Sequence, residues 1–288
     1  MSGKLMKNQV NPMTDDDKEK EAEAEERGVL AEFFWIIVYA LPIAILFRTL
    51  LFEPFHIPSE SMLPTLMIGD YLIVSKATYG YSKHSIPFSP DLFSGRIWAD
   101  YPERGDVAVF KRPKDNESNY IKRIMGLPGD RIQMRGGQLF INGEAVAKER
   151  VEDFKFTESP NTHCRFWPQY RSQAEDGTVT CSYPRYRETL ASGKSYYVLD
   201  LNPQGSSDNT VVYVVPADHF FAMGDNRDNS LDSRRPKAIG VGMLPFENFV
   251  GRAEARFFST DGSASWLKPW KWFSAMRYER FFTSLRAE

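Results

Sequence analysis

The stretch Ile57-Pro58-Ser59-Glu60-Ser61-Met62-Leu63-Pro64-Thr65 follows closely on an apolar run that is long enough to cross a bilayer. Within it, two serines separated by a single residue stand between two prolines. Proline restricts its own backbone and that of the residue before it, which favours extended or turn geometry and presents the two hydroxyls well. We therefore expect these hydroxyls to lie at a membrane face.

The apolar run extends from Phe33 to Phe52 and predicts a transmembrane helix. Twenty helical residues at ~1.5 Å each span ~30 Å, the thickness of a hydrocarbon core. Pro42 is tolerated in a membrane helix, and Arg48, near the exit end, can extend to the interface. A cleaved signal peptide is the alternative. The long charged leader and the lack of a small-residue cleavage site directly after the run argue against it.

Charge sets the expected orientation of the chain. Residues 1–32 cannot bury a core and are expected to be a solvated, partly helical or disordered cytoplasmic leader. Lys18, Lys20 and Arg27 precede the span, whereas residues 53–75 contain no Lys or Arg. The positive-inside bias therefore predicts a cytoplasmic N-terminus and an exported remainder.

Composition narrows the function and the fold class. The 288 residues carry a net charge of −2, which argues against wholesale nucleic-acid binding. Nineteen glycines and eighteen prolines among short β-branched and aromatic runs predict a mainly β body with frequent turns. Cys164 and Cys181 fit neither a zinc site nor a CxxC motif. They are expected to be either two unpaired thiols or a disulfide worth roughly 3 kcal/mol.

Apolar alternation predicts an antiparallel β-sheet domain over residues 53–260, with a second, less regular β subdomain. Asn142-Gly143 between two apolar runs predicts a hairpin with a type I′ turn. Residues 77–104 and 150–190, rich in Pro, Tyr and Arg, are expected to be irregular excursions from this core. The expected strands are Asp70–Val74, Gly105–Phe110, Tyr120–Met125, Gln138–Ile141, Glu144–Val146, Tyr196–Leu199, Val211–Val215 and His219–Met223.

Residues 261–288 form a basic and aromatic tail. In this tail Tyr278, Phe281, Phe282 and Leu285 are spaced as on one face of a helix. The spacing predicts an amphipathic helix, for which two placements remain open. The helix can lie on the membrane surface, or it can pack against the body of the protein.

Several other catalytic and metal-binding patterns are incomplete. The histidines are scattered, with no HExxH and no GxSxG, so a Ser-His-Asp hydrolase is weakly supported. The acidic stretch Asp225–Asp232 lacks the Gly and Glu of a calcium loop, and neither a metal nor another cofactor is expected. Ser207-Asp208-Asn209 and Ser265–Lys268 occur in the reverse order of penicillin-binding motifs, which leaves a penicillin-interacting acyltransferase as a weak alternative.

Four segments, in the right order behind a membrane anchor, resemble the sequence boxes of type I signal peptidases (leader peptidases), and the resemblance covers most of residues 33–256. It implies a membrane-bound serine endopeptidase that removes signal peptides. A catalytically silent, membrane-tethered β scaffold for exported proteins is the alternative. The four segments are Phe55–Leu66, Arg104–Val107, Tyr120–Asp130 and Gly224–Arg234.

The resemblance implies roles for three reactive groups. Ser61 would attack the scissile carbonyl and form an acyl-enzyme. Lys122 would be the general base, which requires a neutral amine. Lowering its pKa from ~10.4 to about 8 corresponds to ~3 kcal/mol of disfavoured charge, which burial beside Tyr120 and Ile121 can supply. Ser59 would donate its hydroxyl to the oxyanion alongside the backbone N–H of Ser61, a contribution of ~3 kcal/mol in the transition state.

Supporting roles fall to residues of the last box. Ser230 is implied to hydrogen-bond Lys122 and orient it. Asp232 would raise the pKa of that lysine, and our hypothesis is that Arg234 pairs with Asp232 and cancels most of its field. Glu60 stands where many family members have Gly. Because positive φ is costly for Glu, we expect a turn that does not need it and a side chain that points to solvent.

The family cleaves secretory precursors after small residues, typically Ala at −1 and −3, which implies shallow apolar pockets. The expected partners are signal-peptide-bearing precursors, the lipid bilayer and, nearby, the secretion translocon, with no nucleic acid. The implied location is the bacterial inner (cytoplasmic) membrane, crossed once, with a periplasmic catalytic domain. The expected substrate-binding residues are Phe55, Ile57, Met62, Leu66, Val109, Tyr120 and Ile121.

Overall fold

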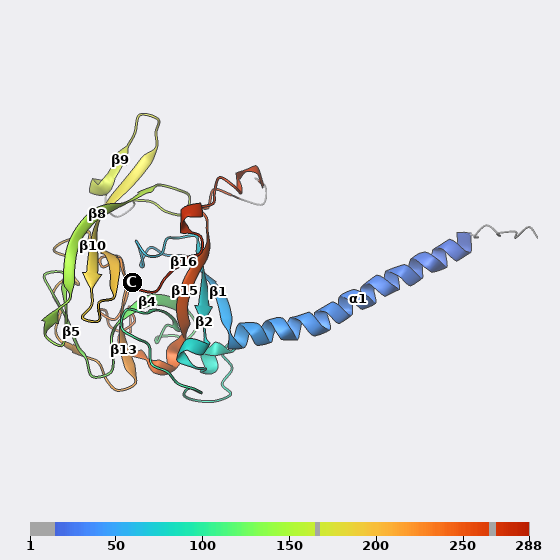
Figure 1. Ribbon diagram of the computed structural model, residues 1–288, viewed down its shortest axis with the longest axis horizontal. Coiled ribbons are helices and arrows are strands. Elements are labelled where there is room, and N and C mark those ends of the chain that lie inside the picture. The colour runs from blue at the N-terminus through green and yellow to red at the C-terminus, as the bar shows by residue number, and fades with distance from the viewer. Residues whose placement is uncertain (1–14, 165–167, 265–268, 288) are drawn as a thin grey trace, which may run out of the picture. The chain divides into compact units, whose positions relative to one another are not determined.

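The structure, a computed structural model, describes residues 15–164, 168–264 and 269–287. The chain divides into a unit of residues 1–48, which holds most of a long helix, and a unit of residues 49–288, which holds the strands (Figure 1). The Ser265–Lys268 motif and the first fourteen residues of the charged leader lie outside the described residues.

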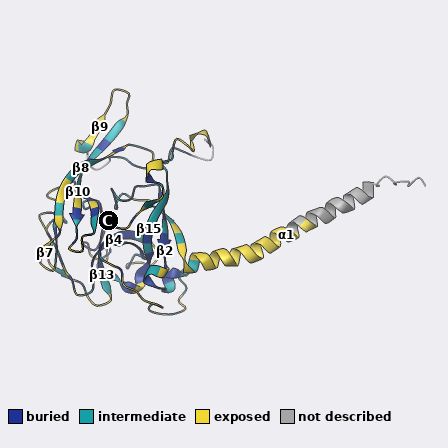
Figure 2. Ribbon diagram, viewed as in Figure 1, coloured by how far each residue is buried: buried dark blue, intermediate teal, exposed yellow. Residues whose placement is uncertain are grey.

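Helix α1 runs from Asp15 to Leu50, so the described part of the charged leader is helical and continuous with the apolar run. Over Ala31–Leu50 the helix is long and apolar enough to span a membrane, and its apolar side chains are exposed (Figure 2). A helix that is apolar on all sides is unfavourable in water and is normally buried in protein or lipid, which fits a membrane anchor. The helix ends at Leu50, and Phe52 already belongs to the first strand.

The largest sheet has eight strands in the order β1-β2-β15-β3-β4-β13-β14, with β16 paired to β15, and all of these pairings are antiparallel. Its central strands are buried on both faces. The strands are β1 (Phe52–His56), β2 (Asp70–Ser75), β3 (Val107–Lys111), β4 (Asn119–Gly126), β13 (His219–Met223), β14 (Leu244–Pro245), β15 (Phe249–Ser259) and β16 (Thr283–Ser284).

Alternation along β3 and β4 decides which side chains share a face. Ala108 of β3 lies opposite Lys122 of β4, and Val109 lies opposite Ile121. Because successive side chains of a strand point to opposite faces, Lys122 and the adjacent Arg123 enter different parts of the interior. Both of these cationic side chains are buried.

A second sheet contains a long hairpin where an irregular excursion is expected. Residues 150–190 are therefore more regular than expected. Residues 150–157 and 179–189 of this segment belong to two paired strands of 11 residues each, and Pro184 marks a register shift between Tyr183 and Arg185. Charged side chains and this proline hide the alternation. The strands are β8 (Ala147–Thr157), β9 (Arg171–Gln173), β10 (Val179–Thr189) and β11 (Ser195–Leu199), in the order β11-β10-β8 with β9 paired to β10.

The third sheet confirms the predicted hairpin. Asn142 and Gly143 have φ of 54° and 89°, as a type I′ turn requires. Residues 77–104, expected as an excursion, contain two short 3₁₀ turns, Ala77–Tyr79 and Lys83–Ser85, and an isolated antiparallel bridge between Tyr81 and Ile97. The strands of the third sheet are β5 (Arg131–Arg135), β6 (Gln138–Ile141), β7 (Glu144–Ala145) and β12 (Tyr213–Val214), in the order β12-β5-β6-β7. The mainly β fold class expected from the sequence is therefore confirmed.

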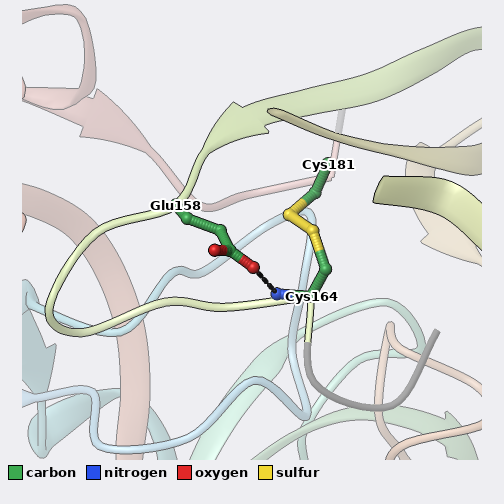
Figure 3. A group of neighbouring side chains, drawn as sticks. All are labelled: Glu158, Cys164 and Cys181. Atoms are coloured by element: carbon green, nitrogen blue, oxygen red, sulfur yellow. Dashed lines mark hydrogen bonds between the residues drawn. A yellow bond between two sulfur atoms is a disulfide. The ribbon is translucent and has the colours of Figure 1, made fainter. Parts of the chain in front are cut away.

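Cys164 and Cys181 form a disulfide, with their Cα atoms 5.9 Å apart (Figure 3). Both cysteines are buried, and Cys181 lies in β10. The backbone N–H of Cys164 also donates to a carboxylate oxygen of Glu158 at 2.9 Å. The bridge thus joins the loop after β8 to the partner strand of the long hairpin.

The helix predicted for the tail is absent from the described residues 269–287. Two short 3₁₀ turns, Pro269–Lys271 and Tyr278–Arg280, are followed by β16. Leu285 is buried in the core, whereas Phe282 is 82% exposed. The tail packs on the body as an irregular segment and a short strand, in which Thr283 and Ser284 pair with β15.

Candidate active site

Ser61 lies in the loop between β1 and β2. Buried Met62 and Leu63 anchor this loop directly after the serine. Asn226 holds it from the other side, since its backbone N–H donates to the carbonyl oxygen of Ser61 at 3.2 Å and its side-chain amide donates to the carbonyl oxygen of Glu60 at 3.2 Å. These contacts fix the loop at Ser61 itself and at the residues on either side of it.

The side chain of Lys122 meets Ser61. Its Nζ lies 2.7 Å from Oγ of Ser61 and also donates to the carbonyl oxygen of Ile121 at 2.8 Å. Lys122 is only 4% exposed. Burial lowers the pKa of Lys122 to about 8, while the negative charges of Asp232 and Asp225 raise it. A substantial fraction of the amine is therefore neutral just above neutral pH, and a neutral amine can accept the proton of the serine hydroxyl.

Arg234 pairs with Asp232 as hypothesised from the sequence. Its Nε and Nη2 donate to the two carboxylate oxygens at 3.0 and 2.9 Å, and neither side chain is more than 1% exposed. Burial raises the pKa of Asp232, but the charge and hydrogen bonds of Arg234 outweigh it and hold that pKa below its usual value. Asp232 is thus ionised, and the arginine offsets much of the field that it exerts on Lys122.

Ser230 is close to these groups but does not make the expected bond. Among the described residues, its buried Oγ has no hydrogen-bond partner and does not reach Lys122. Ser230 instead lies against Gly224. A Cβ at position 224 would come within 2.3 Å of Oγ of Ser230 and 2.5 Å of the carbonyl oxygen of Ser61. Only glycine allows the last box to approach the nucleophile loop this closely.

Two further residues of the nucleophile loop, Ser59 and Glu60, were assigned an environment from the sequence. Ser59 is exposed, and its Oγ lies 3.4 Å from Oγ of Ser61, at the same opening. Glu60 does not have positive φ, in line with the sequence argument. The prediction that its side chain points to solvent is wrong, because Glu60 is half-buried and its carboxylate accepts from the amide of Asn229 at 3.4 Å.

A cavity of about 440 Å³ opens at Ser61 and Lys122. Of the seven residues expected to bind substrate, only Tyr120 and Ile121 line it. The other five pack into one hydrophobic core cluster: Phe55, Ile57, Met62, Leu66 and Val109. The remaining lining residues are Pro58, Ser59, Glu60, Asn119, Ser207, Asp228, Asn229, Ser230, Leu231 and Arg235. Apolar character alone does not distinguish a core residue from a pocket wall.

A buried ion pair formed by Arg123, the residue next to Lys122 on β4, was not predicted from the sequence. Arg123 donates to both carboxylate oxygens of Asp225, at 2.8 and 2.6 Å, and Thr65 donates its hydroxyl to the same carboxylate at 2.5 Å. Each of these residues lies inside a segment that carries the family resemblance. Strand alternation next to Lys122 is the signal that places Arg123 on the opposite face.

Asp200, Asp208 and Asp228 bring three carboxylate oxygens within 4.8 Å of one another. Lys148 pairs with Asp200 at 2.5 Å and so already supplies positive charge to this group. The acidic stretch Asp225–Asp232 contributes only Asp228 to the cluster, because Arg123 and Arg234 engage its other two aspartates.

Comparison with known proteins places the chain in a family. Residues 30–258 match the family model described as signal peptidase, peptidase S26. A signal peptidase I of Rickettsia akari is 37% identical over 273 residues, covering 88% of this chain and 92% of its own. One of Rickettsia typhi is 35% identical over the same length and coverage. A solved signal peptidase I of Enterococcus faecalis V583 is 21% identical, with a TM-score of 0.27 over 53% of this chain and 97% of its own.

The family match and the relatives define the class of protein as a serine endopeptidase. The chain belongs to the signal peptidase family, peptidase S26. It acts in the removal of signal peptides, and its substrates are precursors that carry them. Together with helix α1, family membership fits an enzyme anchored in a membrane.

Proposed function

We propose that the chain removes signal peptides with a serine–lysine dyad, in which Ser61 is the nucleophile and Lys122 the general base. The observation that carries this proposal is the 2.7 Å contact between Oγ of Ser61 and Nζ of Lys122, beside an open cavity. The lysine is buried, and its pKa is lowered to about 8. A base with a pKa close to the working pH combines a useful neutral fraction with a strong driving force for proton transfer.

The reaction follows from this geometry. Neutral Lys122 takes the proton of the Ser61 hydroxyl as Oγ attacks the scissile carbonyl and a tetrahedral intermediate forms. The ammonium of Lys122 then protonates the leaving amine, and an acyl-enzyme remains. The same amine accepts a proton from water in the second half, water attacks the ester, and Oγ of Ser61 is released with its proton restored.

The developing oxyanion needs donors. Ser59 is the candidate side chain, since its Oγ opens on the same cavity 3.4 Å from Oγ of Ser61. The backbone N–H of Ser61 is the second candidate. Removing one preorganised donor of this kind costs about 3 kcal/mol in the transition state. We assign Ser230, Asp232 and Arg234 to positioning, because they set the surroundings of Lys122 rather than touch its proton.

We propose cleavage after small residues, as in Ala-X-Ala sequences. Tyr120, Ile121 and Leu231 give the cavity apolar walls next to Ser61, and such walls reject larger side chains by steric exclusion. Ile121 also belongs to the core cluster that contains Phe55, Ile57, Met62, Leu66 and Val109. Each unwanted methylene is discriminated by only ~1–3 kcal/mol.

For the cellular arrangement, we propose residues 1–32 as a cytoplasmic leader and residues 33–52 as a single membrane anchor, in the bacterial inner membrane. The catalytic unit of residues 53–260 and the tail of residues 261–288 then lie in the periplasm. The absence of Lys and Arg from residues 53–75 supports this orientation. An anchored enzyme meets anchored precursors at the lipid surface, near the translocon, which reduces the entropic cost of alignment.

The experiment uses the purified full chain and a fluorogenic peptide with an Ala-X-Ala site, alongside a matched peptide in which both alanines are replaced by leucine. Ser61→Ala and Lys122→Ala should each abolish cleavage, whereas Lys114→Ala, at an exposed lysine, should not change it. Retention of cleavage in either dyad variant contradicts the proposal. Equal cleavage of the two peptides contradicts the specificity alone.

A further inference from the structure

A second cavity, of about 730 Å³, is formed by β4, β8, β10, β11, β15 and the tail. It shares no lining residue with the cavity at Ser61. Volumes of roughly 300–1,000 Å³ are typical of sites that hold small organic ligands. This cavity therefore has the size of a binding site and is separate from the site proposed for cleavage.

Arginine dominates the lining of this cavity. Six arginines line it, and among the described residues no Asp or Glu does. Four of the six have a close carboxylate partner behind the lining: Arg123 pairs with Asp225, Arg187 with Glu149, Arg280 with Asp70, and Arg286 with Glu254. Arg185 and Arg256 are the other two.

The hydrogen bonds of Arg256 go to neutral partners. Its Nε donates to the hydroxyl of Thr283 at 2.7 Å, and its Nη1 donates to the carbonyl oxygen of Thr65 at 2.7 Å. A carboxylate oxygen of Asp70 lies 3.9 Å from Nη1 of Arg256 in a long ion pair, and Arg280 binds the same oxygen more closely, at 2.6 Å. Burial and, to a smaller extent, the charge of Arg280 lower the pKa of Arg256 to about 10, although the charges of Asp70 and Glu279 raise it. An anion in the cavity would relieve this disfavoured charge.

Arg185, on β10, also donates its side-chain hydrogen bond to a neutral group. Its Nε donates to the backbone carbonyl oxygen of Glu152 at 2.9 Å, and its guanidinium lies 4.7 Å from the ring centre of Tyr197. No described carboxylate forms an ion pair with it. Tyr197 and Phe154 add aromatic surface to the same cavity.

We propose that this cavity binds a phosphate ester, whose charge is neutralised by Arg256 and Arg185 and whose organic part packs against the aromatic lining. A phosphate monoester carries a charge of about −1.5 to −2 and three acceptor oxygens. This matches one arginine without a described ion-pair partner and one that shares a distant carboxylate better than a single carboxylate does. The guanidinium fork also suits phosphate oxygens. The ester can come from a phospholipid headgroup or from a soluble metabolite.

The test is isothermal titration calorimetry on the full chain in a nonionic detergent. The soluble probes are glycerol phosphate and inorganic phosphate, with glycerol as the uncharged control. The lipid probe is dihexanoyl phosphatidic acid below its micelle concentration, and a short Glu-rich peptide tests carboxylates. Binding of the lipid alone identifies a headgroup site, and binding of glycerol phosphate alone identifies a soluble ligand. Either result supports the shared phosphate chemistry.

Variants locate the site. Arg256→Gln and Arg185→Gln should each weaken binding of the phosphate ester about tenfold or more, the loss expected for one charge-assisted hydrogen bond. Arg256→Lys should retain part of the affinity. Arg131→Gln, at an exposed arginine outside the cavity, should leave it unchanged. If Arg256→Gln fails to fold, as judged by circular dichroism, Arg185→Gln decides.

The proposal is overturned if no phosphate probe binds the wild-type chain, or if all variants bind equally well. Binding of the acidic peptide without binding of any phosphate ester also overturns it. The readout is affinity rather than cleavage, so the outcome does not depend on the mechanism proposed for Ser61 and Lys122.

Discussion

Arg234 donates hydrogen bonds to both carboxylate oxygens of Asp232, and neither side chain is more than 1% exposed. In the proposed mechanism the pair bears on catalysis, because Asp232 raises the pKa of Lys122 while burial lowers it. An enzyme that needs a neutral amine gains from having this carboxylate offset by a neighbouring cation.

Replacing one partner should move the pH profile in a known direction. Arg234→Gln leaves the charge of Asp232 uncompensated, raises the pKa of Lys122 and shifts the rise of kcat/KM to higher pH. Asp232→Asn removes a negative charge and should shift it to lower pH. Each change breaks a buried pair and should cost about 3–5 kcal/mol of stability, so the profiles are measured at a temperature at which circular dichroism shows folded protein. An unchanged profile in both variants refutes the argument.

The wild-type pH profile follows from the pKa of Lys122, which is about 8 in the free enzyme. Below this pH the amine is protonated and cannot accept the proton of Ser61, so kcat/KM should fall tenfold per unit. Above it, activity should reach a plateau. Lys122→Arg keeps the charge and cannot lose it, and should reduce activity about 100-fold or more at every pH. A profile with no inflection between pH 7 and 9 would argue against lysine as the base.

Gly224 should be intolerant of a single methyl group. A Cβ there would meet Oγ of Ser230 at 2.3 Å and the carbonyl oxygen of Ser61 at 2.5 Å. Gly224→Ala must therefore displace the nucleophile loop, and a shift of about 1 Å can cost ~100-fold in rate. Gly28→Ala is the matched control, since a Cβ at Gly28 meets nothing within 4 Å. Peptide-cleavage assays check both variants, and full activity in Gly224→Ala would contradict this geometry.

The disulfide should contribute to stability without entering the chemistry. Cys164 and Cys181 are separated by 17 residues in sequence, and closing a loop of that size stabilises a fold by roughly 3 kcal/mol in the chain-entropy model. The double variant Cys164→Ser/Cys181→Ser should therefore unfold at lower denaturant concentration and keep its kcat at 25 °C. Wild-type protein treated with reductant should behave the same way. Equal midpoints with and without the bridge would contradict this expectation.

Turn residues and apolar alternation in the sequence predicted those parts of the fold that short-range interactions determine. The type I′ turn at Asn142-Gly143 and the strands near Tyr120 and His219 follow from turn chemistry and apolar alternation. The long β8–β10 hairpin escaped prediction because charged residues and Pro184 interrupt its pattern. The conformation of the tail was predicted wrongly because its aromatic residues have the spacing of a helix. In the structure its last residues pair with β15 instead.

Some residues of the candidate site were predicted from the sequence and others were not. Ser61, Lys122, Asp232 and Arg234 were identified by family resemblance, and the structure brings them together. Asn226 was missed as a positioning residue because a contact between distant backbone groups leaves no mark in either segment. The pocket walls were overpredicted for a related reason. An apolar side chain such as Val109 is equally suited to a wall and to a core, and only packing separates the two.

The hold of Asn226 on Ser61 and Glu60 has a consequence for biosynthesis. The nucleophile loop is made early, whereas the residue that fixes it arrives 165 positions later. The nucleophile loop of a nascent chain therefore lacks this support until the segment around Asn226 has emerged and folded. Late completion of this kind delays assembly of the proposed site until most of the chain has been made.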